Sequence, residues 1–303
     1  MENKLIVSSS PHIKSPESIK SVMSDVLVAL FPAVLAAVIF FGLPALITIL
    51  VCTLATMLTE AIILRNKNIF GDGSAAVTGV ILALTLPPNP PWWLCVVGSV
   101  AAITIGKHVF GGIGNNIFNP ALVGRALLLV SWAGHMTNWL TPVELTATAT
   151  PLASSSHPGF FNLFVGAVPG SLGETSALAL LLGAAWLFYK GHISWRIPCT
   201  FLAAVFVMGS LLDGGFSLSQ GLFHVLAGGV MLGAFFMATD MVTSPVTPRG
   251  QLIFGLGCGV MTMLVRLYGA YPEGVTFAIL LMNALVPLID NMTLPRKYGE
   301  VAK

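Results

Sequence analysis

Ten apolar segments follow one another along the chain, separated by short polar stretches or by glycine and proline. A helix needs roughly 20 apolar residues to cross a bilayer, and most of these segments approach that length. The pattern therefore predicts an all-α polytopic membrane protein with about ten transmembrane helices. We expect the first five at 26–41, 44–64, 74–86, 91–106 and 117–133, and the second five at 172–189, 197–212, 221–238, 251–268 and 274–290.

Composition supports a membrane protein. Charged residues make up 9% of the 303 residues and hydrophobic residues 55%, whereas soluble domains carry about 25% charged residues. The formal net charge of +2 gives no reason to expect nucleic acid as a partner. The cysteines lie singly in apolar stretches, which favours buried thiols over a disulfide or metal site.

Basic residues orient the predicted helices. With the N-terminus in the cytoplasm and strict alternation, almost all of the 14 Lys and Arg residues fall on the cytoplasmic side, as the positive-inside rule requires. These residues are Lys4, Lys14, Lys20, Arg65, Lys67, Lys107, Lys190, Arg196, Arg249, Arg296, Lys297 and Lys303. The other two are Arg125, inside the fifth span, and Arg266, near the outer end of the ninth. Both termini are therefore expected to be cytoplasmic.

The same count divides the chain into five parts. These are a cytoplasmic segment 1–24, a first five-helix half 25–133, an extracytoplasmic loop 134–171 without Lys or Arg, a second half 172–290 and a cytoplasmic tail 291–303. Two halves with an odd number of spans have opposite orientations, so we expect an inverted repeat. Such repeats bind their ligands near the bilayer midplane, at short or broken helices, and the predicted span 74–86 is one of these.

Ionisable side chains inside a bilayer are costly and face a cavity or a partner. Four of them lie in or at predicted spans: Glu60, Arg125, Asp240 and Glu273. For Glu60, five residues before Arg65, snorkelling to the interface is favoured over a function. Arg125 either pairs with a group inside the helix bundle, snorkels at a helix end, or forms an anion site. The positions of Asp240 and Glu273 are also explained by placement at the membrane interface.

Several motifs resemble one family over residues 16 to 298. They are Asp72-Gly-Ser-Ala-Ala-Val-Thr-Gly79, Phe118-Asn-Pro-Ala-Leu-Val-Gly-Arg125, Ala238-Thr-Asp-Met-Val-Thr-Ser-Pro245, Arg266-Leu-Tyr-Gly-Ala-Tyr-Pro-Glu-Gly-Val-Thr-Phe-Ala278 and Asn283-Ala-Leu-Val-Pro287. In this order they resemble the D subunits of Rnf electron-transport complexes, which are related to the B subunits of sodium-pumping NADH:quinone reductases.

The resemblance implies a covalent cofactor. These subunits hold FMN by a phosphoester bond to a threonine, which a flavin transferase attaches at a motif close to D-x-x-[ST]-G-A-[TS]. Aligning its last two positions with Ala149-Thr150 makes Thr150 the acceptor and places Glu144 at the acidic position. Glu replaces Asp there, and Thr148 replaces the glycine. Thr148 is the rival acceptor, but its alignment lacks the acidic residue.

The resemblance also implies a redox function in a complex. The chain is expected to carry electrons between an extracytoplasmic flavin subunit and the NAD-reducing side of a ferredoxin:NAD⁺ oxidoreductase, coupled to Na⁺ or H⁺ transport. No residue is expected to be catalytic by itself. Its partners would be Rnf subunits A, B, C, E and G in a bacterial or archaeal cytoplasmic membrane. Some members of the family carry a second, non-covalent flavin, riboflavin.

Further site residues are hypotheses. We expect Asn119 and Arg125 to make polar contacts to the flavin, because the fifth span leads into the loop that contains Thr150. Asp240, Glu273 and Asn283 are candidates for a cation path, since they are oxygen-bearing groups at or within packed spans. Two alternatives remain open: a channel or transporter of urea-channel architecture, and a membrane anchor without a redox role.

Overall fold

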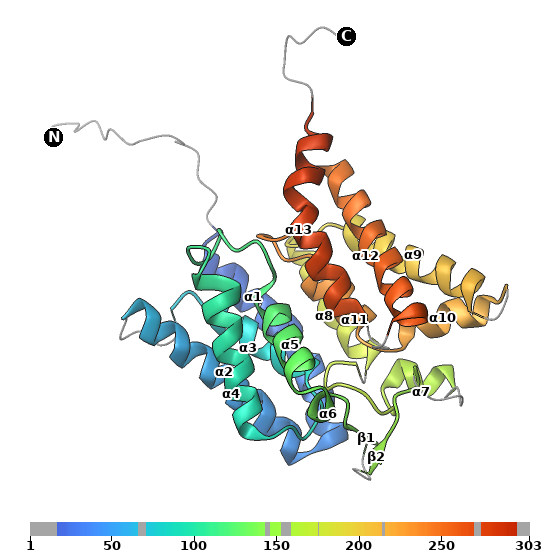
Figure 1. Ribbon diagram of the computed structural model, residues 1–303, viewed down its shortest axis with the longest axis horizontal. Helices are drawn as coiled ribbons and strands as arrows, with labels where there is room; N and C mark the ends of the chain where they lie inside the picture. Colours follow the sequence, from blue (N-terminus) through green and yellow to red (C-terminus); the bar gives the residue numbers. More distant parts are fainter. Residues whose placement is uncertain are drawn as a thin grey trace, which may run out of the picture.

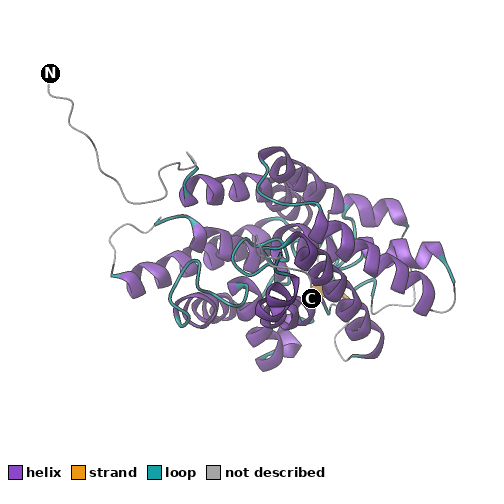
Figure 2. Ribbon diagram, turned by 90° about the horizontal axis from the view of Figure 1, so that it is seen from above, coloured by secondary structure: helices purple, strands orange, loops and turns teal. Residues whose placement is uncertain are grey.

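The computed structural model describes residues 17–65, 71–142, 146–152, 159–174, 176–213, 216–269 and 274–295, and most of this chain is helical (Figure 1, Figure 2). The first half contains α1 (Ile19–Phe41), α2 (Leu43–Leu64), α3 (Ser74–Thr85), α4 (Trp92–Ile103), the π-helical turn η1 (Thr104–His108) and α5 (Pro120–Ser131). The second half contains α8 (Ala177–Lys190), α9 (Arg196–Leu212), α10 (Leu218–Leu226), α11 (Val230–Leu232), the π-helical turn η2 (Gly233–Met237), α12 (Pro248–Tyr268) and α13 (Val275–Thr293). The segment between the halves contains α6 (Ala133–Met136), β1 (Trp139–Leu140), β2 (Ala147–Thr148) and α7 (Phe160–Val165).

The chain is thus an all-α polytopic membrane protein, as predicted. Among the described residues, four helices are long and apolar enough to cross a membrane: α1, α2, α12 and α13. The bent pair formed by α10 and α11–η2 makes a fifth if it counts as one span. Helices occupy the other predicted spans too, but they are shorter than a full crossing, so the count of ten crossings stays a prediction.

Capping residues explain where the long helices begin. The Ser18 side chain accepts a hydrogen bond from the Ser21 amide, so α1 starts at Ile19 rather than at the predicted residue 26. Asn119 and Thr247 cap α5 and α12 in the same way, and each is followed by a proline in the first turn, where proline costs no hydrogen bond. At the junction of α1 and α2, Gly42 has a φ of 67°, which favours glycine.

Helix packing repeats between the halves. In the first half α2 packs against α3 and α4, and α4 packs against α5. In the second half α9 packs against α10 and α12, and α12 packs against α13. The same order of partners in both halves supports the internal repeat that the spacing of spans predicted.

Each half has a third helix that stops early. The twelve residues of α3 rise about 18 Å, well short of the roughly 30 Å hydrocarbon core. In the second half α10 ends at Leu226, and α11–η2 continues from Val230 after a bend of 68°. These short helices end inside the protein, where their last carbonyl groups need partners.

The halves meet mainly where α1 packs against α8. Gly183 of α8 allows this approach, because a Cβ atom there would overlap the carbonyl oxygen of Ala29 in α1. Beyond the end of α8, His192 Nε2 lies 2.9 Å from Asp25 Oδ2 on α1. Small residues that let helix backbones touch are typical of membrane helix interfaces.

The described chain enters α1 and leaves α13 at one end of the molecule, and α6, β1, β2 and α7 lie at the opposite end (Figure 1). The two short strands are antiparallel, with Trp139 opposite Thr148 and Leu140 opposite Ala147. Which of these ends faces the cytoplasm stays a prediction from the basic residues.

One expectation about the core is wrong. Cys52, Cys95 and Cys258 are buried thiols, but Cys199 is exposed on α9. An apolar run in a membrane protein contacts lipid as well as protein, so its apolar character does not show which residues face inward.

The helix contact at Gly183 can be tested. Gly183→Ala should lower the free energy of unfolding by about 1–3 kcal/mol, because the new methyl group must separate α1 from α8. Thermal unfolding of the purified protein in detergent measures this loss. Gly134→Ala is the matched control, since a Cβ atom there meets nothing within 4 Å; equal melting temperatures for the two variants would contradict the prediction.

Candidate functional site

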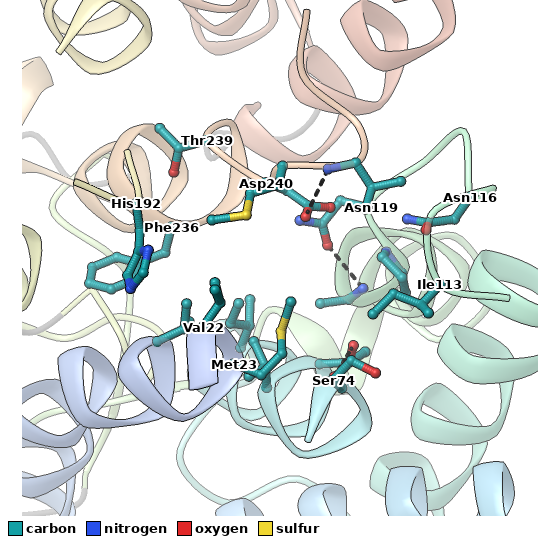
Figure 3. Close-up of a pocket in the computed structure, with 18 of the residues that line it drawn as sticks. Val22, Met23, Ser74, Ile113, Asn116, Asn119, His192, Phe236, Thr239 and Asp240 are labelled. Atoms are coloured by element: carbon teal, nitrogen blue, oxygen red, sulfur yellow. Dashed lines mark hydrogen bonds between the residues drawn. The ribbon is translucent and has the colours of Figure 1, made fainter. Parts of the chain in front are cut away.

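A cavity of about 100 Å³ lies between the halves, at the end where the described chain begins (Figure 3). Val22 and Met23 of α1 and Ser74 of α3 form one wall, and Asn119 and Asp240 face them from the other side (Figure 3). A second, larger cavity of about 370 Å³ lies next to it, and His192 lines both cavities. The cavity is mostly apolar with a few polar groups, as small-molecule sites usually are.

Two of the predicted site residues, Asn119 and Asp240, line this cavity, and hydrogen bonds connect a third, Asn283, to them. Asn119 Nδ2 donates a hydrogen bond to the Met237 carbonyl oxygen, 3.3 Å away. The side-chain amide of Asn283 is oriented so that both its polar atoms have partners. Its oxygen accepts a hydrogen bond from the backbone N–H of Asn119 at 3.2 Å, and its nitrogen donates to the backbone carbonyl oxygen of Thr243 at 3.2 Å. The Thr243 hydroxyl in turn donates to Asp240 Oδ2 at 3.1 Å. The hydrogen bonds therefore join α5, the loop after η2, and α13.

Asp240 lies in the loop that follows η2, outside the helical spans. Burial raises the pKa of its carboxyl group, and this effect outweighs the hydrogen bonds from the Thr243 hydroxyl and the Val242 amide, which lower the pKa. Such a group exchanges between charged and neutral forms more easily near neutral pH than an exposed aspartate does.

Lys107, held in an ion pair with Glu60, lines a further wall of the cavity. Lys107, in η1, is only 3% exposed, and its Nζ lies 2.6 Å from Glu60 Oε1. The same Nζ donates to the Ser74 hydroxyl, which donates to Asp72 Oδ1. The predicted cytoplasmic side of Lys107 is not tested by its burial, but Glu60 pairs with Lys107 rather than snorkelling to the interface as expected. A buried charge needs such a partner.

Thr150 occupies the other end of the molecule, just after β2. Its side chain is 2% exposed, and Oγ1 has no hydrogen-bond partner among the described residues. Thr148, the rival acceptor, is exposed in β2. A buried hydroxyl group without a partner is uncommon in native proteins, so Thr150 Oγ1 fits a position at which another group completes the site.

Arg125 lies between these two places. It follows Asn119 by six residues along α5, and it donates to the Thr85 carbonyl oxygen at the end of α3. The carboxylate of Glu174 interacts electrostatically with the Arg125 guanidinium group. Arg125 thus hydrogen-bonds the last carbonyl of a short helix and interacts electrostatically with Glu174; its contact with a flavin stays a prediction. Glu144 and Glu273 lie outside the described residues.

Arg266 is a site residue that the sequence analysis did not propose. It stands near the end of α12, and its Nη1 and Nη2 donate to the carbonyl oxygens of His224 and Ala227 at 2.7 and 2.8 Å. These carbonyls belong to the end of α10, about forty positions earlier in the chain. The sequence shows Arg266 only as a basic residue near the end of a predicted helix, and nothing in that pattern predicts its hydrogen bonds to the end of α10.

The fold and these sites define a multi-pass membrane protein built from two similar helical halves, with polar groups enclosed at both ends. Comparison with known proteins identifies the family. Residues 6–299 match the NQR2, RnfD, RnfE family, and the chain belongs to it.

Curated relatives cover nearly the whole chain. It is 49% identical to the D subunit of the Na⁺-translocating ferredoxin:NAD⁺ oxidoreductase complex of Acetobacterium woodii, over 98% of this chain and 96% of the relative. It is 44% identical to the D subunit of the proton-translocating ferredoxin:NAD⁺ oxidoreductase complex of Clostridium ljungdahlii, over 98% and 97%. It is 37% identical to the D subunit of the ion-translocating oxidoreductase complex of Escherichia fergusonii, over 97% and 98%.

The raised pKa of Asp240 predicts a pH dependence of stability. A carboxyl group with a higher pKa in the folded state binds protons more readily there than in the unfolded chain. Its contribution therefore becomes less favourable as pH rises from about 3.8, the ordinary value, through the raised pKa. Asp240→Asn should melt at a higher temperature than wild type at pH 7, and the difference should shrink as pH falls toward 4.

Thermal unfolding across this pH range provides the measurement, and Asp240→Glu, which keeps the ionisable group, is the control. A difference between wild type and Asp240→Asn that stays constant from pH 4 to pH 8 would show that Asp240 titrates normally.

Proposed function

We propose that this chain is an electron-carrying membrane subunit of an ion-translocating ferredoxin:NAD⁺ oxidoreductase complex. Near-full-length similarity to D subunits of such complexes supports this function, and so does membership of the family. The two relatives are named for different ions, Na⁺ and H⁺. The partners are then the other Rnf subunits, A, B, C, E and G, in a cytoplasmic membrane.

The cofactor of this proposal is FMN bound through a phosphoester to Thr150. The single observation that carries it is the buried Thr150 Oγ1 without a hydrogen-bond partner among the described residues. Attachment would require a flavin transferase acting before this segment packs against the protein, because the hydroxyl group is covered. Bound FMN supplies one- and two-electron transfer, and the surrounding protein sets its potential.

The position of Thr150 suits a carrier on the extracytoplasmic side. The hairpin β1–β2 lies at the end of the molecule opposite to the start of α1 and the end of α13 (Figure 1). Under the proposed orientation that end faces an extracytoplasmic flavin subunit. A covalent bond keeps the redox group from being lost to the outside.

The cavity between the halves is the place we propose for the remaining functions. Phe235 and Phe236 line it together with Asn119 and Asp240, so aromatic faces and hydrogen-bonding groups suited to a non-covalent flavin such as riboflavin are present. Asp240 and Asn283 offer oxygen atoms near that cavity for a cation path, with Glu273 as a further candidate.

A channel or a redox-inactive anchor would need no flavin. The cavity between the halves is the observation that favours a channel. Neither alternative accounts for a buried threonine hydroxyl without a partner in the described part of the loop on the far side.

Mass spectrometry of the peptide that contains Thr148 and Thr150 tests the proposal, using protein from its native membrane. We expect an FMN adduct on Thr150. Thr150→Ala should abolish the flavin fluorescence of this subunit on a denaturing gel and stop electron flow from ferredoxin to NAD⁺ in the assembled complex.

Thr148→Ala is the matched control and should keep both the fluorescence and the electron flow. An adduct on Thr148 would keep the redox function but move the attachment site. A bare wild-type peptide, with electron flow unaffected by Thr150→Ala, would support the anchor; a bare peptide with ion flux in the isolated subunit would support the channel.

A further inference from the structure

A third, smaller cavity lies where the interrupted helices of the two halves meet. It is lined by Thr85 at the end of α3, by Gly229 in the break between α10 and α11, and by Val275 and Thr276 at the start of α13. Space for the centre of a water molecule amounts to about 10 Å³ there, close to the minimum that one water molecule needs. The cavity therefore has the size of a single water molecule.

This cavity is surrounded by protein. All the side chains that line it are buried, and none is more than 8% exposed. Leu232 and Met237 belong to its apolar lining, whereas Ser171, Glu174 and Arg125 belong to its polar lining. A polar molecule inside it is away from bulk water, so the protein has to supply its hydrogen bonds.

The segment from Ser171 to Glu174 brings an unpartnered hydroxyl group to this cavity. The Gly173 amide donates to the Leu84 carbonyl oxygen, 2.6 Å away, which holds the segment on the end of α3. The Ser171 amide donates to Glu174 Oε2 at 3.2 Å. Ser171 Oγ, in contrast, is buried and has no hydrogen-bond partner in the described part of the chain. A buried hydroxyl group without a partner is destabilising, so a ligand that bonds to Ser171 Oγ removes this cost.

The charged groups that line the cavity favour a neutral ligand. The Arg125 guanidinium group and the Glu174 carboxylate both line it. At such short range the guanidinium group repels a cation and the carboxylate repels an anion. A water molecule has no net charge, and it both donates and accepts hydrogen bonds. It can therefore accept from the Ser171 hydroxyl group and donate to the Glu174 carboxylate, whose two oxygens accept several hydrogen bonds.

We propose that this cavity is a binding site for one water molecule, which accepts a hydrogen bond from the Ser171 hydroxyl group and donates one to the Glu174 carboxylate. The water molecule holds this carboxylate at the place where α3 ends and the break after α10 begins. The same charged groups keep ions out of the cavity. This inference is independent of flavin attachment, because no residue of the Thr150 segment lines the cavity.

Two structures of the full-length wild-type protein test the ligand and its charge. They are determined in NaCl and in RbBr, at a resolution that shows ordered water. A peak should lie within hydrogen-bond distance of both Ser171 Oγ and a Glu174 carboxylate oxygen, with the same height in the two salts. Because Rb⁺ and Br⁻ scatter much more strongly than water, Na⁺ or Cl⁻, a higher peak in RbBr would show an ion at the site.

Thermal unfolding of Ser171→Ala in detergent tests the same site through the sign of the stability change. With a water molecule on Ser171 Oγ, alanine removes a satisfied hydrogen bond, and the melting temperature should fall by roughly 2–4 °C. Without any partner, alanine removes an unpaired buried group, and the melting temperature should rise. Ser99→Ala is the matched control and should fall, because Ser99 is fully buried and its hydroxyl group donates to the Cys52 carbonyl oxygen at 3.2 Å.

Each outcome decides for or against the water site. A peak of equal height in both salts, together with a lower melting temperature for Ser171→Ala, supports it. The absence of a peak, a higher peak in RbBr, or a melting temperature of Ser171→Ala equal to or above that of wild type would overturn it. If Ser171→Ala does not fold, the two wild-type structures decide. None of these results bears on the attachment of FMN to Thr150, which the mass spectrum of its peptide tests separately.

Discussion

Helices that stop part-way through a membrane protein leave carbonyl groups that only the protein can satisfy, and two arginines meet this requirement here. Arg125 donates to the Thr85 carbonyl at the end of α3. Arg266 donates to the carbonyls of His224 and Ala227 at the end of α10. Without these donors neither short helix could end where it does. The space beyond each end, where the two halves enclose polar groups, depends on both contacts.

This solution introduces a second constraint, because each arginine carries a positive charge into the interior. Glu174 interacts electrostatically with both guanidinium groups. The same low dielectric that strengthens these contacts makes an unbalanced charge costly. The segment that contains Thr150 packs beside Arg266 through Leu152, because Gly228 has no side chain to keep the two apart.

Hydropathy predicted where the helices lie but not how they end. The expected span 221–238 was continuous in the sequence, yet Gly228, with its positive φ, divides it into α10 and α11–η2. Many membrane helices contain a pair of glycines, so the sequence alone does not show that Gly228 and Gly229 break the helix; the 68° bend in the structure does. Lys107 was counted as a cytoplasmic charge because it follows a span; its burial depends on Glu60 from α2, a contact between segments far apart in sequence. Asn119, Asp240 and Asn283 were chosen separately as polar residues at spans, and their hydrogen-bonded arrangement follows from the packing of α5 against α13.

The two polar regions are joined by one short helix. Asn119 begins α5 at the cavity, and Arg125 lies six residues further on, a rise of about 9 Å, beside Glu174. Between them α5 buries Leu122 completely, so the regions are separated by packed side chains rather than by water. Over such a distance a unit charge changes the energy of another by about 2 kcal/mol at an effective dielectric constant near 20. The function proposed above requires a coupling free energy between these two regions, and α5 is the helix that connects them.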